Sequence, residues 1–92
     1  MYLEIVSPEA TLFSGEVDSV IVPGTSGDFQ MLNNHAPIVS VLKSGTIEIK
    51  SENNIDPKDL NDKILANGNS YTLEINSGTI ELNDNKAIIL VD

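Results

Sequence analysis

The side chains most able to carry out chemistry are a single histidine, His35, and the many serines and aspartates of the chain. A Ser-His-Asp triad needs a nucleophile on a strained turn beside an oxyanion hole, and no nucleophile-elbow motif occurs here. Cysteine is absent, which excludes thiolate catalysis, disulfides and thiolate-held metals. We therefore interpret His35 as a loop histidine that orders its turn or meets a partner, and we predict no catalytic residue.

Metal and cofactor sites are also not predicted. Asp56, Asp59 and Asp62 suggest calcium by spacing, but the segment lacks the central glycine and distal glutamate of a calcium-binding loop. The stretch from Gly24 to Gly27 has two glycines, but no lysine follows at the spacing of a phosphate-binding loop. We interpret it as a tight, exposed turn. It is the strongest contact candidate from the residues alone, with a plain hairpin turn as the alternative.

The charge of the chain limits its partners. The net charge is −9, with five lysines, fourteen carboxylates and no arginine. A chain without a basic stripe is not suited to nucleic acid, and docking on anionic lipid is disfavoured for the same reason. The apolar run Ala87–Val91 is far shorter than the roughly 20 residues that span a bilayer, so no direct lipid insertion is expected. Another protein is therefore the class of partner that the charge allows.

Chain length and residue pattern predict a single all-β domain over residues 1–92. Isoleucine and valine together number eighteen, and these residues favour strands. Apolar and polar residues alternate in short runs separated by Gly, Pro, Asn and Ser, which predicts about ten strands in a sandwich or barrel. We expect Ala87–Val91 to be an inner strand whose far face is covered.

Two further patterns concern the second half of the chain. Residues 51–69 are rich in Asn and Asp, and Asp56-Pro57 resembles a helix start, so we expect an exposed segment with at most a short helical turn near 56–65. The stretch Ser44–Ile49 is echoed by Ser77–Leu82. Two copies are too few for a solenoid, so we expect equivalent turn-plus-strand units in the two sheets.

Five blocks in the first half resemble one known family in order and spacing. The family is the epsilon subunit of the F-type rotary ATP synthase, in its N-terminal domain. A looser resemblance extends to the end of the chain. The blocks are Leu3–Glu9, Phe13–Val20, Val22–Phe29, Asn34–Ile38 and Leu42–Gly45.

The resemblance implies a fold and a function. The fold would be a flattened ten-stranded β-sandwich of two five-stranded sheets. The chain would be a non-catalytic subunit of the central stalk, linking the gamma subunit to the membrane c-ring and coupling proton translocation to ATP synthesis. It would lie on the cytoplasmic side of a bacterial inner membrane, held there through the complex. We also expect an exposed apolar patch, because docking on gamma needs one.

The resemblance also implies which residues meet which partner. The turn that would face the c-ring comprises Gly24, Thr25, Ser26, Gly27, Asp28 and Phe29, with Asp28 where the family usually has Glu. The positions that would face gamma are Ser7, His35 and Ser40.

One departure from the family concerns the end of the chain. Members commonly continue into two antiparallel helices that can inhibit ATP hydrolysis, and in some members these helices bind ATP. This sequence ends at Asp92, so we expect the helical hairpin, and inhibition by that route, to be absent. The alternatives from other classes are a generic small β-sandwich binding module and a small hydrolase.

Overall fold

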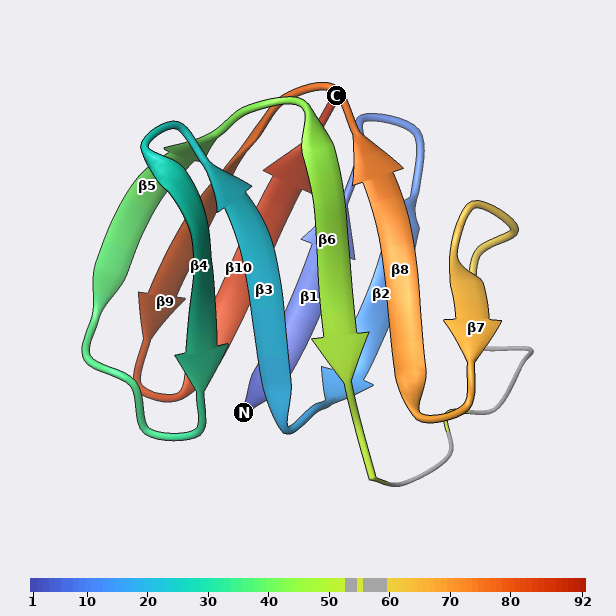
Figure 1. Ribbon diagram of the computed structural model, residues 1–92, viewed down its shortest axis with the longest axis horizontal. Coiled ribbons are helices and arrows are strands. Elements are labelled where there is room, and N and C mark those ends of the chain that lie inside the picture. Colours follow the sequence, from blue (N-terminus) through green and yellow to red (C-terminus); the bar gives the residue numbers. More distant parts are fainter. Residues whose placement is uncertain (53–54, 56–59) are drawn as a thin grey trace.

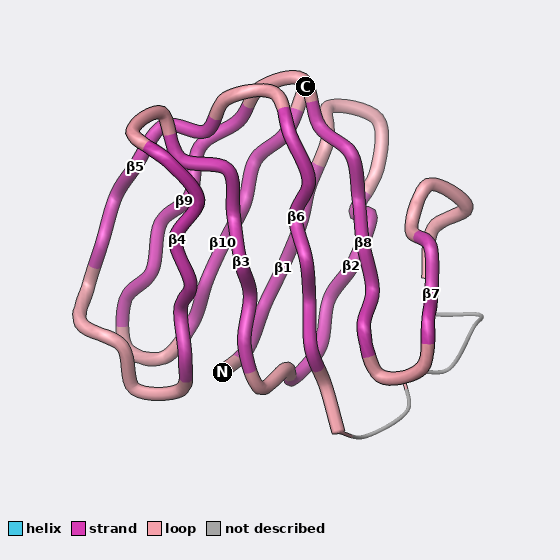
Figure 2. The backbone as a smooth tube through the Cα atoms, viewed as in Figure 1, coloured by secondary structure: helices cyan, strands magenta, loops and turns pink. Residues whose placement is uncertain are grey.

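The computed structural model of the chain describes residues 1–52, 55 and 60–92, and the secondary structure of these residues consists of ten β-strands (Figure 1). Within those residues the backbone consists of strands and loops without a helix (Figure 2), so none is present that could cross a membrane. The strands are β1 (Tyr2–Val6), β2 (Thr11–Glu16), β3 (Ser19–Gly24), β4 (Gly27–Leu32), β5 (Ile38–Leu42), β6 (Gly45–Lys50), β7 (Leu65–Asn67), β8 (Ser70–Ile75), β9 (Gly78–Asn83) and β10 (Lys86–Val91).

The strands form two five-stranded sheets that are joined at one corner. One sheet has the order β4-β3-β6-β8-β7 and lies in front in Figure 1, while the other, behind it, has the order β2-β1-β10-β9-β5. The joining strands β3 and β5 pair only at Gly24 and Leu42. The principal extents of 31 × 27 × 20 Å show the flattening. The predicted ten-stranded sandwich of two five-stranded sheets is therefore confirmed.

The core lies between the two sheets, and the period-two pattern explains how it is filled. Leu3 and Ile5 of β1 are fully buried, as are Ile47 and Ile49 of β6, while their neighbours along each strand are less buried. Successive side chains of a strand point to opposite faces, so each alternating run supplies one layer of the core. Phe13 of β2 is the largest of the fully enclosed side chains.

The last strand corrects one expectation. β10 is an inner strand, as predicted, since it pairs with β1 on one side and β9 on the other. Ala87 and Ile89 point into the core and are fully buried. The prediction that the far face is covered is wrong, because Leu90 on that face is 53% exposed. A continuous apolar run thus leaves part of its hydrophobic surface in solvent.

The internal echo corresponds to strands in different sheets. Ser44–Ile49 supplies β6 of the front sheet, and Ser77–Leu82 supplies β9 of the rear sheet. A Cβ at Gly45 would lie 2.8 Å from Cβ of Pro23, and a Cβ at Gly78 would lie 2.5 Å from the carbonyl oxygen of Leu90. Each of these two strands therefore begins with a glycine because another segment approaches its backbone closely.

The acidic stretch is only partly described. The proposed helix start at residues 56–59, with two of the three aspartates considered for calcium, lies outside the described residues. Asn61–Ile64 forms a turn in which the Ile64 N–H donates to the carbonyl of Asn61 at 2.9 Å, and β7 follows at once. Ile64 is only 7% exposed, and Ile55 and Leu60 pack against the core. Most of the described residues of 51–69 are exposed, as expected, but Ser51 and Ile64 are buried.

Candidate functional site

The turn between β3 and β4 presents its tip to solvent at the end of the sandwich that is uppermost in Figure 1. Gly24 pairs with Gly27, so the loop consists of Thr25 and Ser26, both exposed. Gly27 has a φ of 128°, in the region that favours glycine. This geometry makes a short, stiff projection of the kind that can contact another protein.

The two ends of this turn are fixed in different ways. Gly24 is buried beneath the ring of Phe29, and a Cβ there would lie 2.7 Å from Cε1 of that ring. Phe29 is half-buried and packs against the core. Asp28 lies opposite Pro23 in the ladder and is exposed. The turn is thus anchored by an aromatic ring and directs one carboxylate into solvent.

A second loop supports the first at the same end of the molecule. The N–H of Lys43, which follows β5, donates to the carbonyl oxygen of Pro23 at 2.8 Å. Ser44 and the Lys43 side chain are exposed beside the turn. The region that would face the c-ring therefore carries a cation as well as the carboxylate of Asp28.

Ser7 lies at this end too, in the loop between β1 and β2. Its main-chain N–H and its Oγ both donate to the carbonyl oxygen of Ala10, at 2.8 and 3.2 Å, and Oγ also lies 3.3 Å from the Ala10 nitrogen. Ser7 is 7% exposed. Its side chain thus closes its own turn in the isolated chain.

His35 lies at the opposite end, in the loop between β4 and β5 at the bottom of Figure 1. It is exposed, and its Nδ1 donates to the carbonyl oxygen of Ala36 at 2.7 Å. The loop is held to the β9–β10 turn because the N–H of Asn34 donates to Oδ1 of Asn85 at 2.8 Å. His35 therefore belongs to a polar corner formed by two loops, and its ring nitrogen meets main chain rather than a carboxylate.

Ser40 lies in the middle of β5, between two exposed valines that point the other way. Val39 and Val41 are 79% and 58% exposed on the outer side of the rear sheet. Ser40 pairs with Ile80, whose side chain is in the core, so Ser40 faces the inner side of this edge strand and is half-buried. The structure therefore does not bring Ser7, His35 and Ser40 together. The roles of these positions and of the turn stay predictions.

The outer side of the rear sheet carries an apolar surface that sequence reasoning expected but did not locate. The ladder places Val41, Thr79, Leu90 and Val6 in one row across β5, β9, β10 and β1. The neighbouring row holds Val39, Glu81, Ile88 and Glu4. We name this surface the outer apolar face; it comprises Val6, Val39, Val41, Ile88 and Leu90.

The front sheet differs on its outer side. Its exposed positions on β4, β6 and β8 are mostly polar, and include Asp28, Gln30, Thr46 and Glu74, the last two joined by a hydrogen bond. An exposed apolar patch was predicted, and it is confirmed. The apolar patch could have been located from two features of the sequence. These are the unbroken apolar run of β10 and the two valines that flank Ser40 in β5.

The described residues contain no group of three or more His, Cys, Asp or Glu side chains able to hold a metal ion. Hollows in the described part of the chain include one beside β5 and β9, one at the ends of several strands, and one between the β4–β5 and β9–β10 loops. The chain thus has the features of a small β-sandwich that acts through its surfaces, in which two loops at one end and one apolar face offer contacts.

The comparisons with known proteins agree with this class. Residues 1–60 match the family described as ATP synthase, Delta/Epsilon chain, beta-sandwich domain. The ATP synthase epsilon chain of Chlorobaculum tepidum is 38% identical over 90 residues, which cover 98% of this chain and 86% of that relative. The epsilon chain of Campylobacter curvus is 38% identical over 92 residues, but this chain spans only 60% of its length.

Solved structures of ATP synthase chains have the same fold as this chain. A chain in the central stalk and c-ring of the Tetrahymena thermophila mitochondrial ATP synthase superposes with a TM-score of 0.75 at 13% identity, covering 99% of this chain and 62% of that one. A chain of the Euglena gracilis mitochondrial ATP synthase also gives 0.75, at 19% identity, covering 97% and 48%. At such identities these matches support the fold alone.

The chain belongs to the ATP synthase delta/epsilon family, and its curated relatives are epsilon chains. The resemblance identified from the five sequence blocks is therefore confirmed. So is the prediction of a non-catalytic subunit, because the epsilon chain has no catalytic role in the complex. The absence of a helical hairpin after the sandwich stays a prediction.

Proposed function

We propose that this chain is an epsilon-type subunit of the central stalk of an F-type ATP synthase, which links the gamma subunit to the c-ring and couples proton translocation to ATP synthesis. The structural observation that carries this proposal is the outer apolar face. The family membership and the bacterial epsilon-chain relatives support it. The complex would hold the chain at the cytoplasmic side of a bacterial inner membrane.

The outer apolar face is suited to gamma. Val39 and Val41 on β5 and Leu90 on β10 are each more than half exposed, and β9, which lies between these strands, places Thr79 and Glu81 on the same side. Contiguous exposed apolar surface on a small soluble domain marks an interaction site, and stable interfaces gain most of their free energy from such desolvated surface. A subunit that must turn with gamma without slipping needs this kind of broad contact.

The β3–β4 turn is suited to the polar loops of the c-ring. It projects exposed Thr25, Ser26 and Asp28, and Lys43 lies beside it. Individual exposed ion pairs contribute only about 0–1 kcal/mol each. The turn would therefore set the fit against the ring, while the apolar contact with gamma supplies most of the binding free energy.

Binding of the purified gamma subunit tests the proposal. The chain is mixed with gamma from the same organism and the mixture is resolved by size-exclusion chromatography at low and high salt. A stable one-to-one complex that persists at high salt is expected, because apolar contact is not screened by ions. Absence of a complex at every salt concentration would overturn the proposal.

A further inference from the structure

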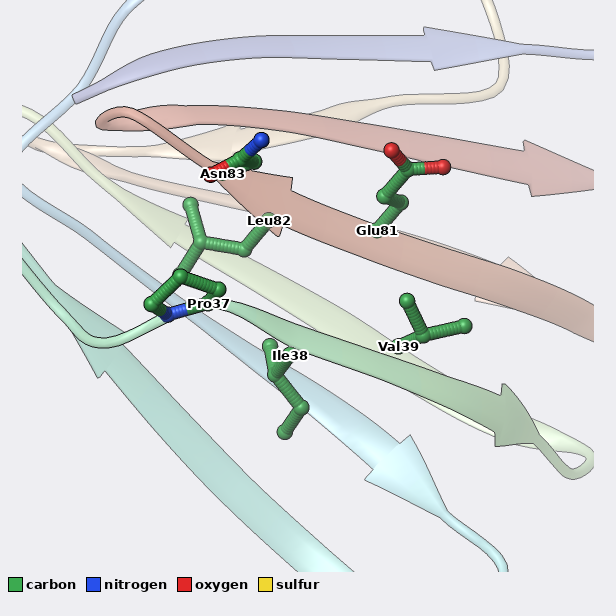
Figure 3. A pocket seen from close by; sticks show the side chains of 6 residues that line it. All are labelled: Pro37, Ile38, Val39, Glu81, Leu82 and Asn83. Atoms are coloured by element: carbon green, nitrogen blue, oxygen red, sulfur yellow. The ribbon is translucent and has the colours of Figure 1, made fainter.

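A hollow of 270 Å³ adjoins the outer apolar face where β5 begins and β9 ends (Figure 3). It is lined by residues of only these two segments, which are Pro37, Ile38, Val39, Glu81, Leu82 and Asn83. Val39 and Glu81 are directly opposite in the ladder, and Figure 3 shows both side chains rising from the same side of their strands. The hollow thus combines apolar walls with one carboxylate.

The carboxylate of Glu81 has no cation beside it within the described part of the chain. The ion pairs found there join the Met1 amino group to Glu16 and Lys50 to Glu48. The nearest lysine along the neighbouring strand, Lys86, places its Nζ 5.6 Å from the centre of the Tyr2 ring. Glu81 is exposed and is free to pair with a group from outside.

The walls of the hollow suit a long aliphatic side chain. Pro37 and Val39 are both exposed and apolar, and Val39 is 79% exposed, the highest value among the large hydrophobic side chains described. Lysine and arginine cover apolar surface with their methylene stems while the charged head reaches a polar partner. Such a side chain would lie on Pro37 and Val39 and meet Glu81, with the Asn83 amide at the rim.

We propose that this hollow is an anchor site for one basic side chain of the protein that covers the outer apolar face. The inference rests on the proposed function, so the partner is gamma, and it specifies the chemistry of that contact. Two observations select a basic group: the lone carboxylate of Glu81, and a net charge of −9 that favours a cationic partner surface. The hollow shares Val39 with the outer apolar face, so one docked protein can fill both.

The test compares two isosteric substitutions. Glu81→Gln removes the charge in the hollow, and Glu74→Gln removes another exposed strand carboxylate on the opposite sheet. The affinity of each full-length variant for purified gamma is measured by titration calorimetry at several salt concentrations. Removing one partner of a charge pair that is desolvated in an interface weakens binding by about 30-fold or more. We expect a loss of that size for Glu81→Gln, a shallower salt dependence, and no loss for Glu74→Gln.

The other outcomes separate this inference from the proposed function. Equal losses for both variants would indicate a general charge effect and overturn the anchor site. Normal affinity of Glu81→Gln, together with a loss for Val39→Ser, would show that the hollow takes an apolar group, which also overturns it while gamma docking stands. Failure of the unmodified chain to bind gamma would overturn both. Unchanged unfolding midpoints of the variants confirm that the fold is retained.

Discussion

The ring of Phe29 lies directly over the backbone of Gly24, so that a Cβ on Gly24 would be 2.7 Å from Cε1 of the ring. The carbonyl oxygen of Gly27 would lie only 2.8 Å from the same added Cβ. This contact joins the exposed tip of the β3–β4 turn to the core, because Phe29 itself packs on the core. This packing is expected to restrain the turn that would meet the c-ring.

Gly24→Ala tests this rigidity. The added methyl group must displace the ring or the main-chain oxygen, and such overpacking costs about 1–3 kcal/mol of unfolding free energy. Urea unfolding of the isolated chain measures the loss. Ser26→Ala, at the exposed tip, serves as the control and should change stability by less than about 0.5 kcal/mol. A Gly24→Ala variant as stable as the control would show that the ring contact does not constrain the turn.

Asp28→Lys tests the contact with the c-ring. Asp28 is exposed, so reversing its charge should leave the stability of the chain within about 0.5 kcal/mol of normal. In the assembled complex we expect weaker assembly or lower proton-driven ATP synthesis. Gln30→Lys, two residues along the same face of β4, is the matched control and should behave as the unmodified chain. Full coupling in the Asp28→Lys complex would remove Asp28 from the contact.

Tyr71→Phe tests how the stretch after β6 is tied to the core. The N–H of Ile55 donates to the hydroxyl oxygen of Tyr71 at 3.1 Å, and Tyr71 is 3% exposed. Loss of this hydrogen bond should cost about 0.5–1.5 kcal/mol and speed hydrogen exchange at Ile55. Tyr2→Phe, which keeps the ring on the outer sheet surface, is the control. If exchange at Ile55 is unaltered, the hydrogen bond does not hold the segment.

Val41→Asp tests the outer apolar face. A carboxylate placed there must be desolvated when gamma docks, so affinity should fall by at least about tenfold. Leu65→Asp is the control, since Leu65 is 69% exposed on β7 of the other sheet. Surface plasmon resonance with immobilised gamma measures both variants. An equal fall for the two, or none for Val41→Asp, would place the docking surface elsewhere.

The alternation of apolar residues was sufficient to predict the fold. Each strand shows on its own which positions share a face, and the turn residues mark where strands end, as at Asp84 and Asn85, whose φ values of 50° and 61° suit a two-residue hairpin turn. The sequence blocks around Gly24 and His35 were sufficient to predict the family. The alternation can be seen within each strand, and the family resemblance can be seen within short sequence blocks.

What could not be predicted depends on contacts between distant segments. Period two does not say which outer face is left uncovered, so the exposure of Leu90 was missed. The short helical turn allowed near 56–65 falls partly outside the described residues, and Leu65 at its end begins β7, whose pairing with β8 no local pattern indicates. Ser40 was assigned from its motif alone, and its orientation away from Val39 and Val41 follows only from the pairing of β5 with β9.

The proposed role of the chain in the rotor can be tested by reconstitution of coupling. Membranes that contain the ATP synthase but lack this chain are supplied with the purified chain, and proton-driven ATP synthesis is measured before and after. We expect synthesis to be recovered in proportion to the chain bound, and the Val41→Asp variant to restore little. Coupled synthesis that is the same with and without the chain would contradict a role in the rotor.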